Sequence, residues 1–129
     1  MAARVTPDQI IAKLKAGERH DLVILAIPSH DRDNKPLNNQ PEWARDALDL
    51  FSELFGGATA FETFAGIYRS ETGDNLLDKP ILIEAYSERT DVESRTNLEQ
   101  LLQFIRRMKV AMRQETVMLV IDEYRWFLG

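Results

Sequence analysis

Four polar side chains stand together just after the first apolar run of the sequence: His30, Asp31, Arg32 and Asp33. Imidazole nitrogens and carboxylate oxygens bind divalent metal ions, and the same groups carry out general acid–base chemistry. His30, Asp31 and Asp33 are therefore the candidate catalytic or metal-binding residues of a small hydrolase or nuclease. The competing interpretation is a solvated loop in which Arg32 pairs with a neighbouring carboxylate. No H-x-x-H or H-E-x-x-H spacing favours the metal site.

A second candidate site, for ligand binding, consists of two carboxylates and two phenols on predicted strands: Glu62, Tyr68, Glu84 and Tyr86. A carboxylate held between aromatic side chains on a central strand loses water, which raises its pKa toward the range of a general base. The alternative is that Glu84 pairs with an arginine, across a dimer or beneath an N-terminal helix. Carboxylates at an interface are more often matched by cations than left free for chemistry.

The composition narrows the kinds of site that the chain can build. None of its 129 residues is cysteine, which excludes disulfides, thiolate metal sites and cysteine nucleophiles. A formal charge of −5 does not favour a nucleic-acid partner, and the apolar segment 22–27 offers no aromatic ring for base stacking. The basic residues Arg106, Arg107, Lys109 and Arg113 are interpreted as a solvated helix face, favoured by the helix dipole. We expect no cofactor.

Membrane insertion and secretion are not expected either. No segment approaches the roughly 18 consecutive apolar residues of a membrane span. The first residues also lack the long apolar core of a signal peptide. The sequence therefore predicts a small, soluble, cytoplasmic protein.

Hydrophobic periodicity and turn residues divide the chain into helices and strands. Thr6 and Gln9 form a T-x-x-Q capping box that predicts a short N-terminal helix, ended by Gly17. Gly56 is expected to end the next helix. Apolar runs or alternating patterns predict strands, and i, i+3, i+4, i+7 stripes predict helices. The strands are expected at 22–27, 59–69, 80–87 and 116–121, and the two long helices at 41–55 and 91–113.

After the N-terminal helix, this β-α-β-β-α-β order resembles the ferredoxin-like α/β plait over roughly 21–123. The resemblance implies an α+β domain with a four-stranded antiparallel sheet, strand order 4-1-3-2, and two helices on one face. We expect one domain, with a helical extension at 1–18, the core at 19–125 and an apolar tail at 126–129. Some small nucleases of this fold place an aspartate just past the first strand, a part that Asp31 or Asp33 would take. The plait hosts unrelated activities, and no functional family motif accompanies it here.

The expected strand order brings distant residues together. The loop after the first strand meets the connection between the second and third strands and the entry to the fourth. The residues expected at this end of the sheet are His30, Asp31, Arg32, Asp33, Arg69, Glu71, Asp74, Asp78, Lys79 and Glu115. Alternation along the strands places a second set on the face that the helices leave open: Glu62, Phe64, Tyr68, Leu82, Glu84 and Tyr86.

The open sheet face is expected to be covered by another segment or molecule. Continuous apolar runs such as 117–121 would otherwise leave a larger apolar patch than soluble monomers usually expose. The candidate covers are the N-terminal helix, the C-terminal segment 124–129 and a second copy of the molecule. Of these we prefer the second copy, and we expect a homodimer through this face. The preferred interpretation is a homodimeric ligand-binding, regulatory or protein-interaction module, with a small molecule or a protein as partner. The alternative is a small metal-dependent hydrolase or nuclease that uses His30, Asp31 and Asp33.

Overall fold

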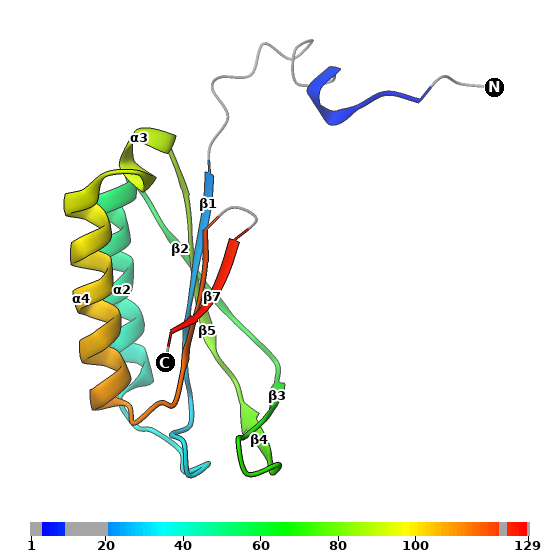
Figure 1. Cartoon of the computed structure of the whole chain (residues 1–129), viewed down its shortest axis with the longest axis vertical. Coiled ribbons are helices and arrows are strands. Elements are labelled where there is room, and N and C mark those ends of the chain that lie inside the picture. Colours follow the sequence, from blue (N-terminus) through cyan, green and yellow to red (C-terminus); the bar gives the residue numbers. More distant parts are fainter. Residues whose placement is uncertain (1–3, 10–20, 122–123, 129) are drawn as a thin grey trace.

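The structure, a computed structural model, describes residues 4–9, 21–121 and 124–128, the last five as backbone. Among the described residues, one strand precedes the first long helix, four strands lie between it and the two following helices, and two strands come last (Figure 1). The strands are β1 (Asp21–Ile27), β2 (Thr59–Glu62), β3 (Gly66–Arg69), β4 (Asn75–Asp78), β5 (Ile81–Ser87), β6 (Val117–Ile121) and β7 (Tyr124–Leu128). The helices are α2 (Gln40–Phe55), α3 (Arg89–Val92) and α4 (Arg95–Ala111).

A five-stranded antiparallel sheet, in the order β2-β5-β1-β6-β7, forms the centre of the molecule. Helices α2 and α4 lie together on one side of this sheet (Figure 1). Strands β3 and β4 form a separate two-stranded sheet. The predicted α+β class is confirmed, but the main sheet has one more strand than expected and a hairpin that was not expected.

The additional strand is β7, in the segment that was predicted as an apolar tail. It pairs along the whole length of β6, with Val117 opposite Leu128 and Ile121 opposite Tyr124. Aromatic residues favour extended structure, and β6 would otherwise leave a row of unpaired backbone groups at the edge of the sheet. Residues 126–128 of the predicted apolar tail thus belong to β7.

The predicted second strand, 59–69, is broken into β2 and β3. Its pairing with β5 stops where Pro80, which has no N–H to donate, precedes that strand. The hydroxyl of Thr63 donates to the carbonyl of Pro80 at 2.7 Å instead. Beyond this point β3 pairs with β4, and β4 lies in the segment that was predicted as the connection between the second and third strands. Gly73, with a φ of 90°, supplies the left-handed turn of this hairpin.

The core lies between the main sheet and the two long helices. On β1 the alternate residues Val23, Leu25 and Ile27 are fully buried and face the helices. Phe51 of α2 and Met108 of α4 are also fully buried in this core. The apolar stripes predicted for both helices are thus the surfaces that hold them to the sheet.

The faces of β2 were predicted the wrong way round. Phe61 pairs with Leu82 and Glu62 pairs with Ile81, and residues paired in this way share a face. Phe61 therefore lies on the open face with Glu84, whereas Glu62 lies on the helix side. A strand with period-two alternation reverses both faces when its phase shifts by one residue.

Two predicted helix signals are confirmed. The backbone N–H of Thr6 donates to Oε1 of Gln9 at 2.8 Å, and the backbone N–H of Gln9 donates to Oγ1 of Thr6 at 3.3 Å. Gly56, with a φ of 89°, ends α2 and donates its N–H to the carbonyl of Ser52. The rest of the predicted N-terminal helix, including Gly17, lies outside the described residues. Of the helices in the described part of the chain, none has both the length and the apolarity of a membrane span.

Candidate functional site

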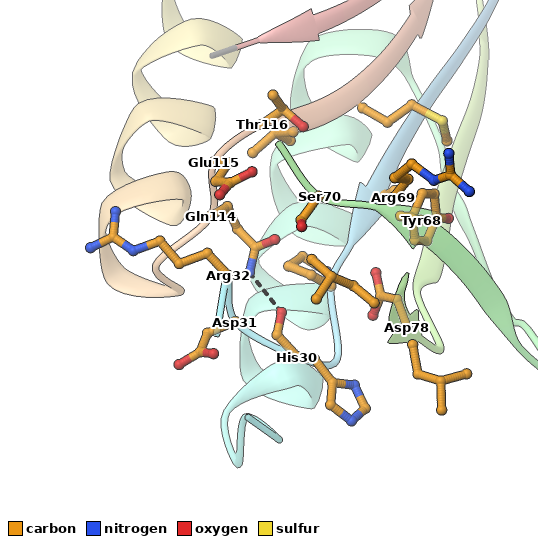
Figure 2. Close-up of a pocket in the computed structure, with 16 residues that line it drawn as sticks. His30, Asp31, Arg32, Tyr68, Arg69, Ser70, Asp78, Gln114, Glu115 and Thr116 are labelled. Carbon is orange, nitrogen blue, oxygen red and sulfur yellow. Dashed lines mark hydrogen bonds between the residues drawn. The ribbon is translucent and has the colours of Figure 1, made fainter. Parts of the chain in front are cut away.

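A cavity of about 140 Å³ lies at one end of the main sheet (Figure 2). Three segments enclose it: the loop after β1, the hairpin β3–β4 and the residues that lead into β6. The hairpin and the loop lie at the same end of the molecule (Figure 1). The lining residues are Ala26, Pro28, His30, Asp31, Arg32, Tyr68, Arg69, Ser70, Leu76, Leu77, Asp78, Gln114, Glu115, Thr116, Val117 and Met118.

The cavity gathers much of the cluster that was predicted at this end of the sheet. The members of that cluster that line it are His30, Asp31, Arg32, Arg69, Asp78 and Glu115. The sequence placed these residues near one another, although it did not indicate the hairpin that closes the cavity. The lining mixes both charges with hydroxyl groups, one phenol and aliphatic side chains.

Asp31 organises the loop that forms one wall of the cavity. Its Oδ1 accepts hydrogen bonds from the backbone N–H groups of Asp33 at 2.9 Å and Lys35 at 3.0 Å. The residue is 7% exposed. Burial by itself raises the pKa of Asp31, but these two hydrogen bonds and the positive charges of Arg113 and Lys35 outweigh it. The pKa of Asp31 therefore lies below its ordinary value of 3.8.

Arg113 fastens this loop to the end of α4. Its Nη2 donates to Oδ2 of Asp33 at 2.7 Å, and its Nη1 lies 3.5 Å from Oδ2 of Asp31. The backbone carbonyl of Arg113 accepts a hydrogen bond from the N–H of Arg32 at 2.8 Å. The sequence assigned Arg113 to a solvated basic helix face. That interpretation was wrong, because the residue lies just past α4 and engages both loop carboxylates.

Gln114 joins the same two segments from inside the cavity wall. Its Nε2 donates to the carbonyls of His30 and Met112, both at 2.8 Å, and the bond to His30 is drawn in Figure 2. The backbone of His30 is thus held by the segment that leads into β6.

The side chain of His30 belongs to a different network. Figure 2 shows its imidazole and the carboxylate of Asp31 pointing to opposite sides of the loop. Nδ1 of His30 lies 2.7 Å from Oγ of Ser29, and that hydroxyl donates to Oδ1 of Asp78 at 2.7 Å. The sequence grouped Asp78 with the loop but gave Ser29 no role.

The three candidate metal ligands His30, Asp31 and Asp33 therefore do not converge on one point. Among the residues that the structure describes, no group of three or more histidine or carboxylate side chains is arranged to hold a metal ion. The two aspartates are committed to Arg113 and to backbone N–H groups. We find no geometry in this loop that supports its use for metal-dependent hydrolysis.

The predicted ligand-binding set separates into three places. Tyr68 lines the cavity, Glu84 and Tyr86 share the open face, and Glu62 lies beside α2. A hydrogen bond to Glu84, together with the negative charge of that carboxylate and partial burial, raises the pKa of Tyr86. Tyr86 is 64% exposed, so this pair is a surface feature without an enclosed site around it.

Tyr68 is the aromatic wall of the cavity. Its pKa is raised, first by burial and then by the negative charge of Asp78. Its ring lies against Gly66, where a Cβ atom would be 3.0 Å from both Cε2 and the phenol oxygen of Tyr68. The absence of a side chain at Gly66 therefore makes room for the ring.

No protein family and no curated protein matches the sequence. Among solved structures, the chain is similar to a phage SAM lyase in complex with S-methyl-5′-thioadenosine, with a TM-score of 0.61 and 14% identity over 86% of this chain and 92% of that one. A phage SAM lyase in the apo state gives a TM-score of 0.59, with 15% identity over 88% of this chain and 93% of that one. The divalent cation tolerance protein (Cut A1) from Thermus thermophilus gives a TM-score of 0.51, with 16% identity over 81% of this chain and 84% of that one. At these identities the likeness is one of fold, which agrees with the sequence-based recognition of a fold without a functional family.

Proposed function

We propose that this chain is a ligand-binding domain that holds a small molecule of the nucleoside type in the cavity between the loop after β1 and the hairpin β3–β4. The observation that carries the proposal is the composition of the cavity wall. The aromatic ring of Tyr68 lines the cavity together with the apolar residues Leu76 and Met118, and polar residues such as Asp78 and Thr116 line it as well. An aromatic and aliphatic pocket with a few polar groups is the usual form of a small-molecule site.

The size of the cavity supports a modest ligand. Its 140 Å³ is smaller than the roughly 300–1,000 Å³ of sites that enclose a drug-sized molecule. A single heteroaromatic ring fits this space, with the remainder of the ligand at the surface. Ribose hydroxyls would find acceptors in Asp78 and Glu115, and donors in Ser70 and Arg69. The fold neighbour whose structure contains S-methyl-5′-thioadenosine supports the choice of a nucleoside as the first ligand class to test.

The rival function, metal-dependent hydrolysis by His30, Asp31 and Asp33, has less support. Both carboxylates are already engaged in holding the loop, and the imidazole points away from Asp31. We therefore prefer binding to hydrolysis. Thermal melting with and without Mg²⁺, Mn²⁺ or Zn²⁺ tests this preference, because a metal ion bound to the folded chain would raise the melting temperature.

We also propose that the domain, which we infer to be a ferredoxin-like plait extended by β7, forms a homodimer through its open face. The residues that support this are apolar and only partly buried in the single chain: Leu22, Ile24, Ala26, Phe61, Leu82, Met118 and Val120. Phe61 is 47% exposed. A patch of this kind is typical of an interaction surface.

Titration calorimetry with S-methyl-5′-thioadenosine and adenosine tests the binding proposal directly. We expect Tyr68→Ala to weaken binding about tenfold or more, because an aromatic ring under a base contributes roughly 1–3 kcal/mol. Ile67→Ala is the matched control, since Ile67 is exposed on the same strand and does not line the cavity. The proposal fails if neither compound binds, or if both variants bind as the parent does.

A further inference from the structure

Ser29 is the centre of a hydrogen-bond network that includes two residues of the cavity wall, His30 and Asp78. Its Oγ lies 2.7 Å from each of three atoms: Nδ1 of His30, Oδ1 of Asp78 and the backbone nitrogen of Lys79. The backbone N–H of Ser29 also donates to Oδ1 of Asp78, at 2.7 Å. Residues 49 and 50 positions apart are thus joined where β1 ends and β5 begins.

The protons of this network can be assigned by counting donors. A carboxylate only accepts, and a backbone N–H only donates. The single hydroxyl proton of Ser29 must point to Asp78, because two oxygens 2.7 Å apart with no proton between them would repel each other. The lone pairs of the hydroxyl are then left for the N–H of Lys79 and for Nδ1 of His30. Nδ1 must therefore carry a proton, which leaves Nε2 of the neutral imidazole without one.

We propose that Asp78 and Ser29 fix His30 in the Nδ1–H tautomer, so that Nε2 is the hydrogen-bond acceptor for an N–H or O–H group of the cavity ligand. This inference rests on the proposed function. It names the chemistry that the ligand must supply: a donor group beside a ring, as in the amino group or the ribose hydroxyls of an aminopurine nucleoside. Ser29 and Asp78 are positioning residues, and His30 is the residue that contacts the ligand.

The arrangement also separates this network from a serine hydrolase. In a catalytic triad the histidine lies between the serine and the acid, and accepts the serine proton. Here the serine lies between the acid and the histidine, and its proton is directed to Asp78. With both lone pairs also occupied, Ser29 is not an activated nucleophile. The ordering of the three groups thus favours recognition by His30 over attack by Ser29.

A first experiment reads the tautomer without any ligand. Nitrogen-15 NMR at mildly alkaline pH distinguishes a ring nitrogen that carries a proton from one that does not. The chain has two histidines, so the spectrum of His30→Gln assigns the signals. We expect the proton on Nδ1 in the parent chain and in Ser29→Thr, which keeps the hydroxyl. In Ser29→Ala we expect this preference to be lost. A proton on Nε2 in the parent chain overturns the inference.

A second experiment measures whether Nε2 is used. Calorimetry with S-methyl-5′-thioadenosine is expected to give about three- to tenfold weaker binding for Ser29→Ala and His30→Gln, the loss of one oriented hydrogen bond. Ser29→Thr is expected to restore the affinity. Ser52→Ala, on the exposed surface of α2, is the matched control and is expected to bind as the parent does.

The two experiments fail in different ways. Unchanged affinity in Ser29→Ala and His30→Gln, with clear binding by the parent chain, overturns the acceptor role of His30 and leaves the proposed function intact. A parent chain that binds neither S-methyl-5′-thioadenosine nor adenosine contradicts the proposed function and the acceptor role together. The NMR result alone then decides whether Ser29 and Asp78 fix the tautomer.

Discussion

Nη2 of Arg113 lies 2.7 Å from Oδ2 of Asp33, although the two residues are 80 positions apart in the sequence. The same guanidinium faces the buried carboxylate of Asp31 at 3.5 Å. This contact joins the end of α4 to the loop that forms one wall of the cavity. It also explains why two aspartates next to a histidine do not form a metal site: Asp31 bonds to backbone N–H groups of the loop, and both carboxylates face Arg113.

Replacing Arg113 by Gln is expected to destabilise the fold. The change leaves the buried carboxylate of Asp31 without its nearest full positive charge, and it breaks the hydrogen bond to Asp33. We expect a loss of about 1–2 kcal/mol in the free energy of unfolding, the usual cost of removing one partner of a partly buried charged hydrogen bond. Urea denaturation at neutral pH measures it.

Arg95→Gln is the matched control for this prediction. Arg95 pairs with Glu99 one turn along α4 at 3.0 Å, and its side chain is 91% exposed. A pair in such contact with water contributes roughly 0.3–0.5 kcal/mol. Equal losses in the two variants would mean that the link between α4 and the loop adds nothing to stability beyond an ordinary surface pair.

Asp31 is expected to make the stability of the fold depend on acid pH. Its pKa in the folded chain is below 3.8, which means that folding stabilises the ionised carboxylate relative to the protonated one. The resulting stabilisation is complete well above pH 3.8 and is lost as the pH falls through the folded pKa. In Asp31→Asn the amide oxygen can still accept the N–H bonds of Asp33 and Lys35, but the charge is gone.

Urea denaturation of the parent chain and Asp31→Asn between about pH 7 and pH 2.5 tests this dependence. We expect the parent to be the more stable at neutral pH, and the difference between the two to shrink steadily below about pH 4. A difference that is the same at both ends of this range would show that the charge of Asp31 does not contribute.

Much of the scaffold could be predicted because its signals are local. The apolar run that became β1 and the stripes of α2 and α4 gave these elements to within a few residues. The predicted β-α-β-β-α-β order sets the direction of each strand, and these directions placed His30 and Asp78 at one end of the sheet. These inferences needed only periodicity and the reach of short connections.

The parts that could not be predicted depend on pairing between segments. Which side chains of β2 face the helices is decided by its register with β5. The sequence could not decide this, because Phe61 and Phe64 place one aromatic ring on each face in either case. The hairpin β3–β4 has ordinary strand residues on both sides of a turn, but its place over the cavity is a tertiary result. Ser29 gave no signal in the sequence, because its role comes from three atoms that the fold brings within 2.7 Å.

Gly66→Ala is expected to weaken ligand binding more than it weakens the fold. The added Cβ atom would lie 3.0 Å from the ring of Tyr68, so the ring must move by a few tenths of an ångström or more. Tyr68 is partly exposed and can move at little cost in stability, but its new position no longer matches the cavity. We expect weaker binding of S-methyl-5′-thioadenosine in calorimetry, and a melting temperature within a few degrees of the parent value.

Gly57→Ala serves as the control, since a Cβ atom at Gly57 meets nothing within 4 Å. Its affinity is expected to equal that of the parent chain. If Gly66→Ala also binds as the parent does, the position of the Tyr68 ring is not a determinant of binding.

A charged residue in the open face is expected to break the proposed homodimer. Leu82 lies on this face, paired with Phe61 on β2 and Ala26 on β1, and it is half-buried in the single chain. A lysine at this position would have to lose its water on association, without a partner that the dimer was built to supply. We expect light scattering at micromolar concentration to give a dimer for the parent chain and a monomer for Leu82→Lys.

Val110→Lys, on the exposed side of α4 and 79% exposed in the parent, is expected to remain dimeric. A parent chain that is monomeric under these conditions would remove the second copy as the cover of the open face, and the partly exposed apolar side chains there would then need another partner.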